Sequence, residues 1–245
     1  MTARSDEDRT TAAGQRGMWH TWAPPAARAG AAPPPPAQYR RAYPGRHGGS
    51  LELLLGPVGA RKSGALINAK RRWQVAKRRV LLVAYAPPGV AGGIPRDGPL
   101  DNRDGVHEAA VLSDTLVAMS TVLHLTCYDV LCVDEGQFFP DLLAGVSVWL
   151  AAGKPVVVGG IDSTYEGAPC DGQTVQLPGN ILALVAWATT VTKLHAVCLA
   201  CGAMDAAFSQ RLPSAEGDGA DLADKRHYEA RCYRCFDPPR DEEAQ

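Results

Sequence analysis

A short loop at residues 56–63, with the sequence G-P-V-G-A-R-K-S, carries residue types suited to binding phosphate. Gly56, Lys62 and Ser63 stand at the spacing G-x-x-x-x-G-K-[ST]. In such a loop, small residues let backbone N–H groups face the anion, the lysine reaches the outer phosphates and the hydroxyl serves Mg²⁺. The loop therefore predicts a nucleotide phosphate site. The alternative is an ordinary strand-to-helix turn with a chance Lys-Ser pair.

Arg61 departs from this pattern because it occupies the place of the second glycine. A side chain there predicts a backbone conformation that costs about 1 to 2 kcal/mol, or a group that intrudes on the phosphate volume. The loop is thus expected to be strained at this residue.

A second group of chemical interest is the acidic pair Asp134 and Glu135, which follows the apolar run 130–133. A carboxylate at the carboxyl end of a buried strand can hold a metal through water, and a second one can deprotonate an attacking hydroxyl. Asp134 suits the first role and Glu135 the second. The alternative is a solvated acidic pair that merely ends a strand.

Four cysteines form two C-x-x-C pairs, which are Cys198 with Cys201 and Cys232 with Cys235. Two such pairs can supply the four thiolates of a closed tetrahedral zinc site. The long segment between the pairs is then expected to be a loop pinned at its base. A redox-active C-x-x-C is the less favoured interpretation, because one pair would suffice for it.

These residues need a scaffold, and the apolar pattern predicts one. Short apolar runs at 51–55, 80–84, 130–133 and 155–158 predict buried strands. Segments with helical spacing lie between them, at 63–74, 106–119 and 142–152. Strands that alternate with helices predict an α/β fold, with a parallel sheet covered on both faces.

The chain divides into four parts by composition. Residues 1–48, rich in Pro and Ala, predict a disordered arm, most simply a solvated tail, although its arginines could touch an anionic partner. Residues 49–190 predict the nucleotide-binding α/β domain, and residues 191–236 a small zinc-bearing domain. Residues 237–245 form an acidic tail.

Composition also limits the partners of the chain. The formal net charge is −1 over 245 residues, so no overall basic field favours nucleic acid. No apolar run approaches the roughly 20 residues that a membrane-spanning helix requires, and no secretory signal is present. We therefore expect a soluble, cytoplasmic protein with neither a nucleic acid nor a membrane as partner.

Taken in order, the three motifs resemble the thymidine kinase family that combines a P-loop domain with a zinc-bearing lasso domain. The family loop reads G-P-M-F-S-G-K-[ST], which Gly56, Pro57, Lys62 and Ser63 match, and its D-E-G-Q-F-F is matched in full by residues 134–139. The resemblance implies a transferase that uses ATP, Mg²⁺ and structural Zn²⁺ to phosphorylate thymidine or deoxyuridine for DNA synthesis. It also implies a homotetramer.

The resemblance assigns further residues to the site. It implies that Asp134, Gln137 and Asp104, which stands in a segment like the family's H-D-G, serve ATP and Mg²⁺, with Glu135 as general base. The nucleoside-binding residues that it implies are Phe138, which would stack on the pyrimidine, Tyr165 of the G-I-D-S-T-Y segment, Ser209 of A-A-F-S-Q-R and Tyr228 of the lasso.

Three differences from the family motifs set up competing hypotheses. Val58 and Arg61 change the loop, residues 169–172 replace the family's P-F-G, and the segment ahead of Tyr228 is longer. The leading hypothesis is phosphoryl transfer from ATP to the 5′-hydroxyl of thymidine. The second is a catalytically impaired relative that binds nucleotides or a protein partner. The third is a P-loop ATPase whose zinc module serves a macromolecule.

Overall fold

The computed structural model describes residues 49–88, 96–101, 105, 107–117, 119, 125–173, 177–212 and 227–237. The predicted arm at 1–48 lies outside these residues. Seven strands form one sheet in the order β3-β4-β2-β5-β6-β1-β7, and β8 pairs with β9 in a separate ribbon. The strands are β1 Leu51–Leu55, β2 Val80–Tyr85, β3 Arg96–Asp101, β4 His107–Ser113, β5 Val130–Asp134, β6 Val156–Gly160, β7 Thr190–Lys193, β8 Phe208–Arg211 and β9 Tyr228–Arg231.

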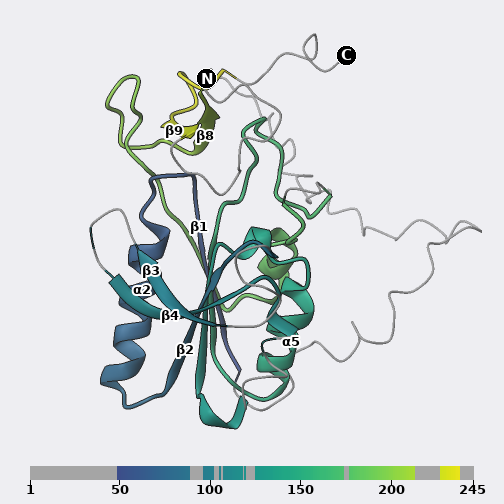
Figure 1. Ribbon diagram of the computed structural model, residues 1–245. Helices are drawn as coiled ribbons and strands as arrows, with labels where there is room; N and C mark the ends of the chain where they lie inside the picture. The colour runs from purple at the N-terminus through teal and green to yellow at the C-terminus, as the bar shows by residue number, and fades with distance from the viewer. Residues whose placement is uncertain are drawn as a thin grey trace, which may run out of the picture. The chain divides into compact units, whose positions relative to one another are not determined.

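Helices cover both faces of the large sheet (Figure 1). Helix α2, Lys62–Val75, packs on one face, and α5, Leu142–Ala151, packs on the other together with the 3-10 helix η3, Leu182–Trp187. Two further 3-10 turns are η1, Leu125–Cys127, and η2, Gly136–Phe138. All strand pairs in this sheet are parallel except β3 with β4. The predicted α/β class and layered architecture are confirmed.

Strand β5 shows why its apolar run is continuous. Leu131 and Val133 pack into the core under α5, whereas Val130 and Cys132 pack into the core under α2. Side chains alternate between the two faces of a strand, so a strand covered on both faces needs apolar residues at successive positions. The predicted strands at 51–55, 80–84, 130–133 and 155–158 and the predicted helices at 63–74 and 142–152 all form, within two residues of their expected ends.

The predicted helix at 106–119 is wrong for most of its length. Residues 107–113 form β4, which pairs in parallel with β2 and antiparallel with the edge strand β3. Helical conformation begins only at Leu116, where the Asp141 carboxylate accepts hydrogen bonds from the N–H groups of Leu116 and Val117 at 2.9 and 2.7 Å. Pairing with two neighbouring strands overrides the weak local helical pattern.

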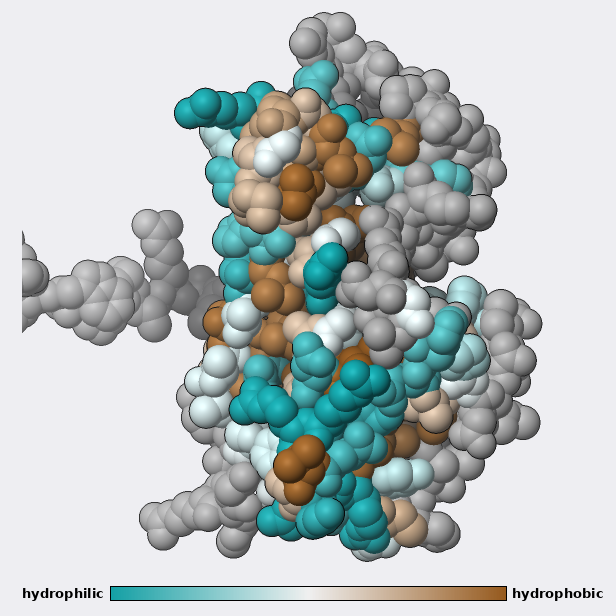
Figure 2. Space-filling view, turned by 90° about the vertical axis from the view of Figure 1, so that its left-hand side faces the viewer, coloured by the Kyte–Doolittle hydropathy of each residue, from teal (hydrophilic) through white to brown (hydrophobic). Residues whose placement is uncertain are grey.

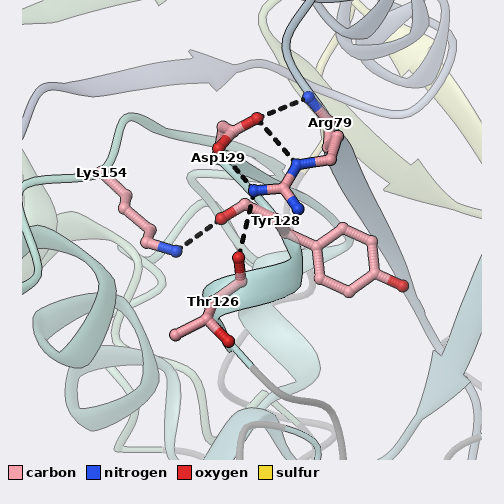
Figure 3. A network of polar contacts seen from close by, with 5 residues as sticks. All are labelled: Arg79, Thr126, Tyr128, Asp129 and Lys154. Atoms are coloured by element: carbon pink, nitrogen blue, oxygen red, sulfur yellow. Dashed lines mark hydrogen bonds and ion pairs between the residues drawn. The ribbon is translucent and has the colours of Figure 1, made fainter.

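A polar network fixes the amino-terminal ends of three neighbouring strands (Figure 3). Arg79, just before β2, donates from Nη2 to Asp129 Oδ1 at 3.0 Å and to the Thr126 carbonyl at 3.0 Å. Lys154, just before β6, donates to the Tyr128 carbonyl at 2.5 Å. Because β2, β5 and β6 are adjacent, the network holds their register at the edge of the sheet opposite the phosphate loop.

We expect Asp129→Asn to lower Tm slightly near neutral pH, and the difference from the native chain to vanish in acid. Hydrogen bonds from Arg79 lower the pKa of Asp129 from 3.8 to about 2. The carboxylate therefore stabilises the fold above its ordinary pKa, and this contribution is lost as pH falls from 3.8 toward about 2. The effect is small because the pair is solvent-exposed. Thermal melts across this range check it, and a gap that does not change with pH would contradict it.

In the described part of the chain, no helix is both long enough and apolar enough to cross a membrane.

Candidate functional site

The phosphate loop lies where the sequence predicts, between β1 and α2. Gly56 has φ +152°, and a Cβ there would lie 2.4 Å from the Leu194 carbonyl oxygen, so only glycine fits. Lys62 is the first residue of α2 and is 7% exposed. Its Nζ donates to the Pro57 carbonyl at 2.8 Å, which folds the lysine back over the loop.

Arg61 adopts the left-handed conformation, with φ 60° and ψ 32°, and its side chain is exposed. The strain expected from the sequence is therefore confirmed. The conformation costs a residue with a side chain about 1 to 2 kcal/mol, whereas glycine adopts it freely. This conformational strain falls on the residue immediately before α2, which sets the direction of the first N–H groups of the helix.

We expect Arg61→Gly to stabilise the fold by about 1 kcal/mol and to lower the KM for ATP several-fold, because glycine relieves the strain and lets the backbone approach the phosphates. Lys77→Gly is the matched control: Lys77 also has positive φ, at 58°, but lies beyond the far end of α2. It should gain stability without a change in KM. A higher KM in Arg61→Gly would instead show that the guanidinium binds the triphosphate.

The acidic pair stands at the carboxyl end of β5. Asp134 is 1% exposed, and its Oδ2 accepts a hydrogen bond from Ser63 Oγ at 2.8 Å. This contact joins the start of α2 to the end of β5, so the predicted hydroxyl and carboxylate do meet. Glu135 follows with φ 55°, a left-handed backbone conformation that residues other than glycine seldom adopt. Strain of this kind clusters at functional sites, and here it falls on the residue expected to act as a base.

Two glycines at the end of β6 make room for these groups. Strand β6 lies between β1 and β5 in the sheet. A Cβ at Gly159 would touch Asp134 Oδ1 at 3.4 Å, and one at Gly160 would lie 2.5 Å from Gln137 Oε1. Glycine in a strand often marks close approach by another group, so the G-G at 159–160 was a readable signal that sequence reasoning did not use.

An ion pair between Lys193 and Asp162 spans the root of the phosphate loop. Lys193 ends β7 and Asp162 follows β6, and β1 lies between those two strands. The pair therefore links the ends of β6 and β7 on either side of β1, next to the start of the phosphate loop. Sequence reasoning missed it, because nothing in the spacing links residues so far apart.

The expected nucleoside-binding residues fall into two places. Phe138 is 7% exposed and stacks on Tyr85, with ring centroids 5.1 Å apart. Tyr165 and Tyr228 face each other with centroids 6.5 Å apart, and the Arg211 guanidinium lies 5.4 Å from the centre of the Tyr165 ring. Burial raises the pKa of the Tyr165 phenol.

Ser209, on β8, contacts the phosphate loop. Its Oγ accepts a hydrogen bond from the Val58 N–H at 3.0 Å, so β8 is tied directly to the phosphate loop. Gln137 is 1% exposed and bonds through both ends of its amide, to Glu135 and to the backbone of Ile161. Asp104, expected near the phosphates, lies outside the described residues.

Cys198, Cys201, Cys232 and Cys235 come together, with all four sulfur atoms within 4.8 Å of one another. The Sγ atoms of Cys201 and Cys232 are 3.7 Å apart. Tetrahedral zinc with Zn–S bonds of about 2.3 Å places its ligands about 3.8 Å apart, so the cluster has the dimensions and donor set of a zinc site. Backbone N–H groups, first that of Cys232, lower the pKa of the Cys198 thiol to about 6 and favour a thiolate ligand.

The cysteine cluster supports both parts of the site. Ala60 of the phosphate loop packs in the same small core as Cys198 and Cys232. Phe236, one residue after Cys235, stacks on Phe208 with centroids 4.4 Å apart, and a Cβ at Gly167 would lie 3.1 Å from its ring. The turn that carries Tyr165 thus rests on the cysteine module. Seen from the side of α2, the molecule has hydrophilic side chains over the helix and a more hydrophobic surface over the cysteine module (Figure 2).

Comparisons with known proteins agree with this arrangement. The family model "Thymidine kinase" matches residues 49–236. A thymidine kinase of Rhodothermus sp. is 38% identical over 203 residues, which cover 80% of this chain and 86% of that protein. The thymidine kinase of Myxoma virus (strain Lausanne) is 31% identical over 190 residues, covering 78% and 97%, and that of Variola virus is 32% identical, covering 78% and 98%. With the phosphate loop, the acidic pair and the cysteine cluster assembled in one fold, the chain belongs to the thymidine kinase family.

Proposed function

We propose that the chain transfers the γ-phosphoryl group of ATP to the 5′-hydroxyl of thymidine or deoxyuridine. One observation carries the proposal: the hydrogen bond from Ser63 to Asp134 joins the phosphate loop to the acidic strand end, directly beside Glu135. A phosphate cradle, a metal-binding carboxylate and a candidate base are thereby gathered at one edge of the sheet.

The reaction needs little covalent chemistry from the protein. Gly56 and Pro57 shape the loop around the triphosphate, Lys62 neutralises its outer phosphates, and Mg²⁺ bound with ATP supplies further charge neutralisation. The residues proposed to hold Mg²⁺ and the phosphates are Ser63, Asp134 and Asp104. Glu135 accepts the proton of the 5′-hydroxyl as that oxygen bonds to the γ-phosphorus, and ADP leaves on the opposite side.

We propose that four side chains hold the nucleoside: Phe138, Tyr165, Ser209 and Tyr228. The aromatic rings offer stacking surfaces for the pyrimidine. The Ser209 contact with Val58 would couple the nucleoside side of the site to the phosphate loop. The α/β domain at 49–190 would then supply the chemistry, and the domain at 191–236 would close over the nucleoside.

The four clustered cysteines are proposed to hold a structural Zn²⁺, which would fix the base of the segment carrying Tyr228. By resemblance to the family, we also propose a homotetramer. Size-exclusion chromatography with light scattering would test this assembly independently of activity.

Thymidine-stimulated ADP formation tests the proposed function. We expect ADP release by the purified chain with Mg²⁺ to depend on thymidine or deoxyuridine and to be unaffected by purine nucleosides. ADP release that is insensitive to thymidine would replace the proposal with a P-loop ATPase. No ADP release, with activity restored in Arg61→Gly, would show an impaired relative, as the strained loop allows.

A further inference from the structure

Gln137 is held at both ends of its side chain. Its Nε2 donates to Glu135 Oε2 at 2.6 Å, and its Oε1 accepts from the Ile161 N–H at 3.1 Å. Its backbone carbonyl also accepts from the Gly179 N–H at 2.8 Å. The residue is 1% exposed. It therefore sits as a buried bridge between the candidate base and the end of β6.

Neighbouring residues are shaped around this bridge. A Cβ at Gly160 would lie 2.5 Å from Gln137 Oε1, and one at Gly179 would lie 2.9 Å from its carbonyl oxygen. Both glycines thus leave space that Gln137 uses. A primary amide offers a donor and an acceptor at once, so it can bind a carboxylate on one side and a backbone N–H on the other. Methionine, of similar size, offers no donor and only a weak acceptor.

Glu135 needs such a partner. Its backbone is in a left-handed conformation, and the turn that follows it is only a 3-10 helix of three residues. A general base must be held at hydrogen-bond distance from the proton it removes, and small displacements are costly. A hydrogen bond to one carboxylate oxygen fixes the orientation of the group.

We propose that Gln137 is a positioning residue for the reaction, one that acts through Glu135 by anchoring its carboxylate to the end of β6. This inference rests on the proposed function. It differs from the role in ATP and Mg²⁺ binding that the family resemblance implies, because both ends of the amide are already engaged by the protein.

The decisive experiment is a double-mutant cycle between Glu135→Gln and Gln137→Met. We expect Gln137→Met alone to lower kcat about 10- to 100-fold, with the KM values for ATP and thymidine within about threefold. In the Glu135→Gln background, Gln137→Met should lower kcat no further, because the group it positions is no longer a base. A residue with a merely structural role would lower kcat by the same factor in both backgrounds.

Two further variants complete the test. Gln137→Leu removes both the donor and the acceptor with a different apolar side chain, so it should also lose kcat, and it serves if Gln137→Met does not fold. Gln74→Met makes the same change on the exposed end of α2 and should leave kcat unchanged. Full activity in Gln137→Leu, or equal losses in both backgrounds, would overturn the inference. An inactive native chain would instead overturn the proposed function.

Discussion

Glu135→Gln is expected to lower kcat for thymidine phosphorylation about 100- to 10,000-fold, the range that a general base contributes. The amide keeps the size of the side chain and can still bond to Gln137, but it cannot accept the proton of the 5′-hydroxyl. The loss should fall on kcat, with thymidine affinity nearly unchanged, because the interaction is made only in the transition state. Steady-state kinetics combined with calorimetric thymidine binding would measure both quantities.

Glu108→Gln is a suitable control for that change. Glu108 lies on β4 and pairs with the buried Lys70 and with Arg71, both at 2.6 Å, so its carboxylate supports the fold rather than the site. Hydrogen bonds from Lys70 lower the pKa of Glu108, so the group is charged at neutral pH. Glu108→Gln should lower Tm and retain kcat. If Glu135→Gln kept its kcat, the base would have to be sought elsewhere.

Cys232→Ser is expected to abolish zinc binding and to raise the KM for thymidine by at least about tenfold. Structural zinc contributes about 10 to 16 kcal/mol in small domains, so its loss should unfold the segment that it pins. Phe236 would then no longer support the turn that carries Tyr165, and Tyr228 would lose its anchored strand. Elemental analysis would report the metal, and limited proteolysis would report the unfolding of residues 196–212 and 227–236.

Cys127→Ser is the matched control, because Cys127 is an exposed thiol outside the cluster. It should keep its zinc and its KM. Full zinc occupancy in Cys232→Ser, or a chain without zinc that binds thymidine normally, would contradict the proposed structural role of the cluster.

The parts of the fold that the sequence predicts are those that bury apolar residues on both sides. The run at 130–133 is continuous because its alternate residues enter different cores. Strand β3 could not be predicted, since its R-D-G-P-L-D sequence has the composition of a turn. It pairs at the sheet edge, where a proline is tolerated, and it is held there by β4. The helix expected at 106–119 is wrong for a related reason: residues 107–113 are held as a strand by pairing with β2 and β3, which the local sequence does not reveal.

The contacts of the candidate site also include some that the sequence could predict and some that it could not. Local motifs assigned the Ser63 hydroxyl and the Asp134 carboxylate to Mg²⁺, and the two groups are hydrogen-bonded in the fold. The cysteine spacing likewise predicted the cluster. Contacts between distant segments, such as Lys193 with Asp162 and Ser209 with the Val58 N–H, depend on the three-dimensional fold and leave no spacing to read.

The most direct test of the account is transfer of the terminal phosphate itself. The purified chain would be incubated with Mg²⁺, thymidine and ATP labelled in its γ-phosphate, alongside Glu135→Gln, and the products separated. We expect labelled thymidine 5′-monophosphate, formed in proportion to ADP and reduced about 100-fold or more in the variant. No labelled nucleotide above the level of the Glu135→Gln variant would contradict it.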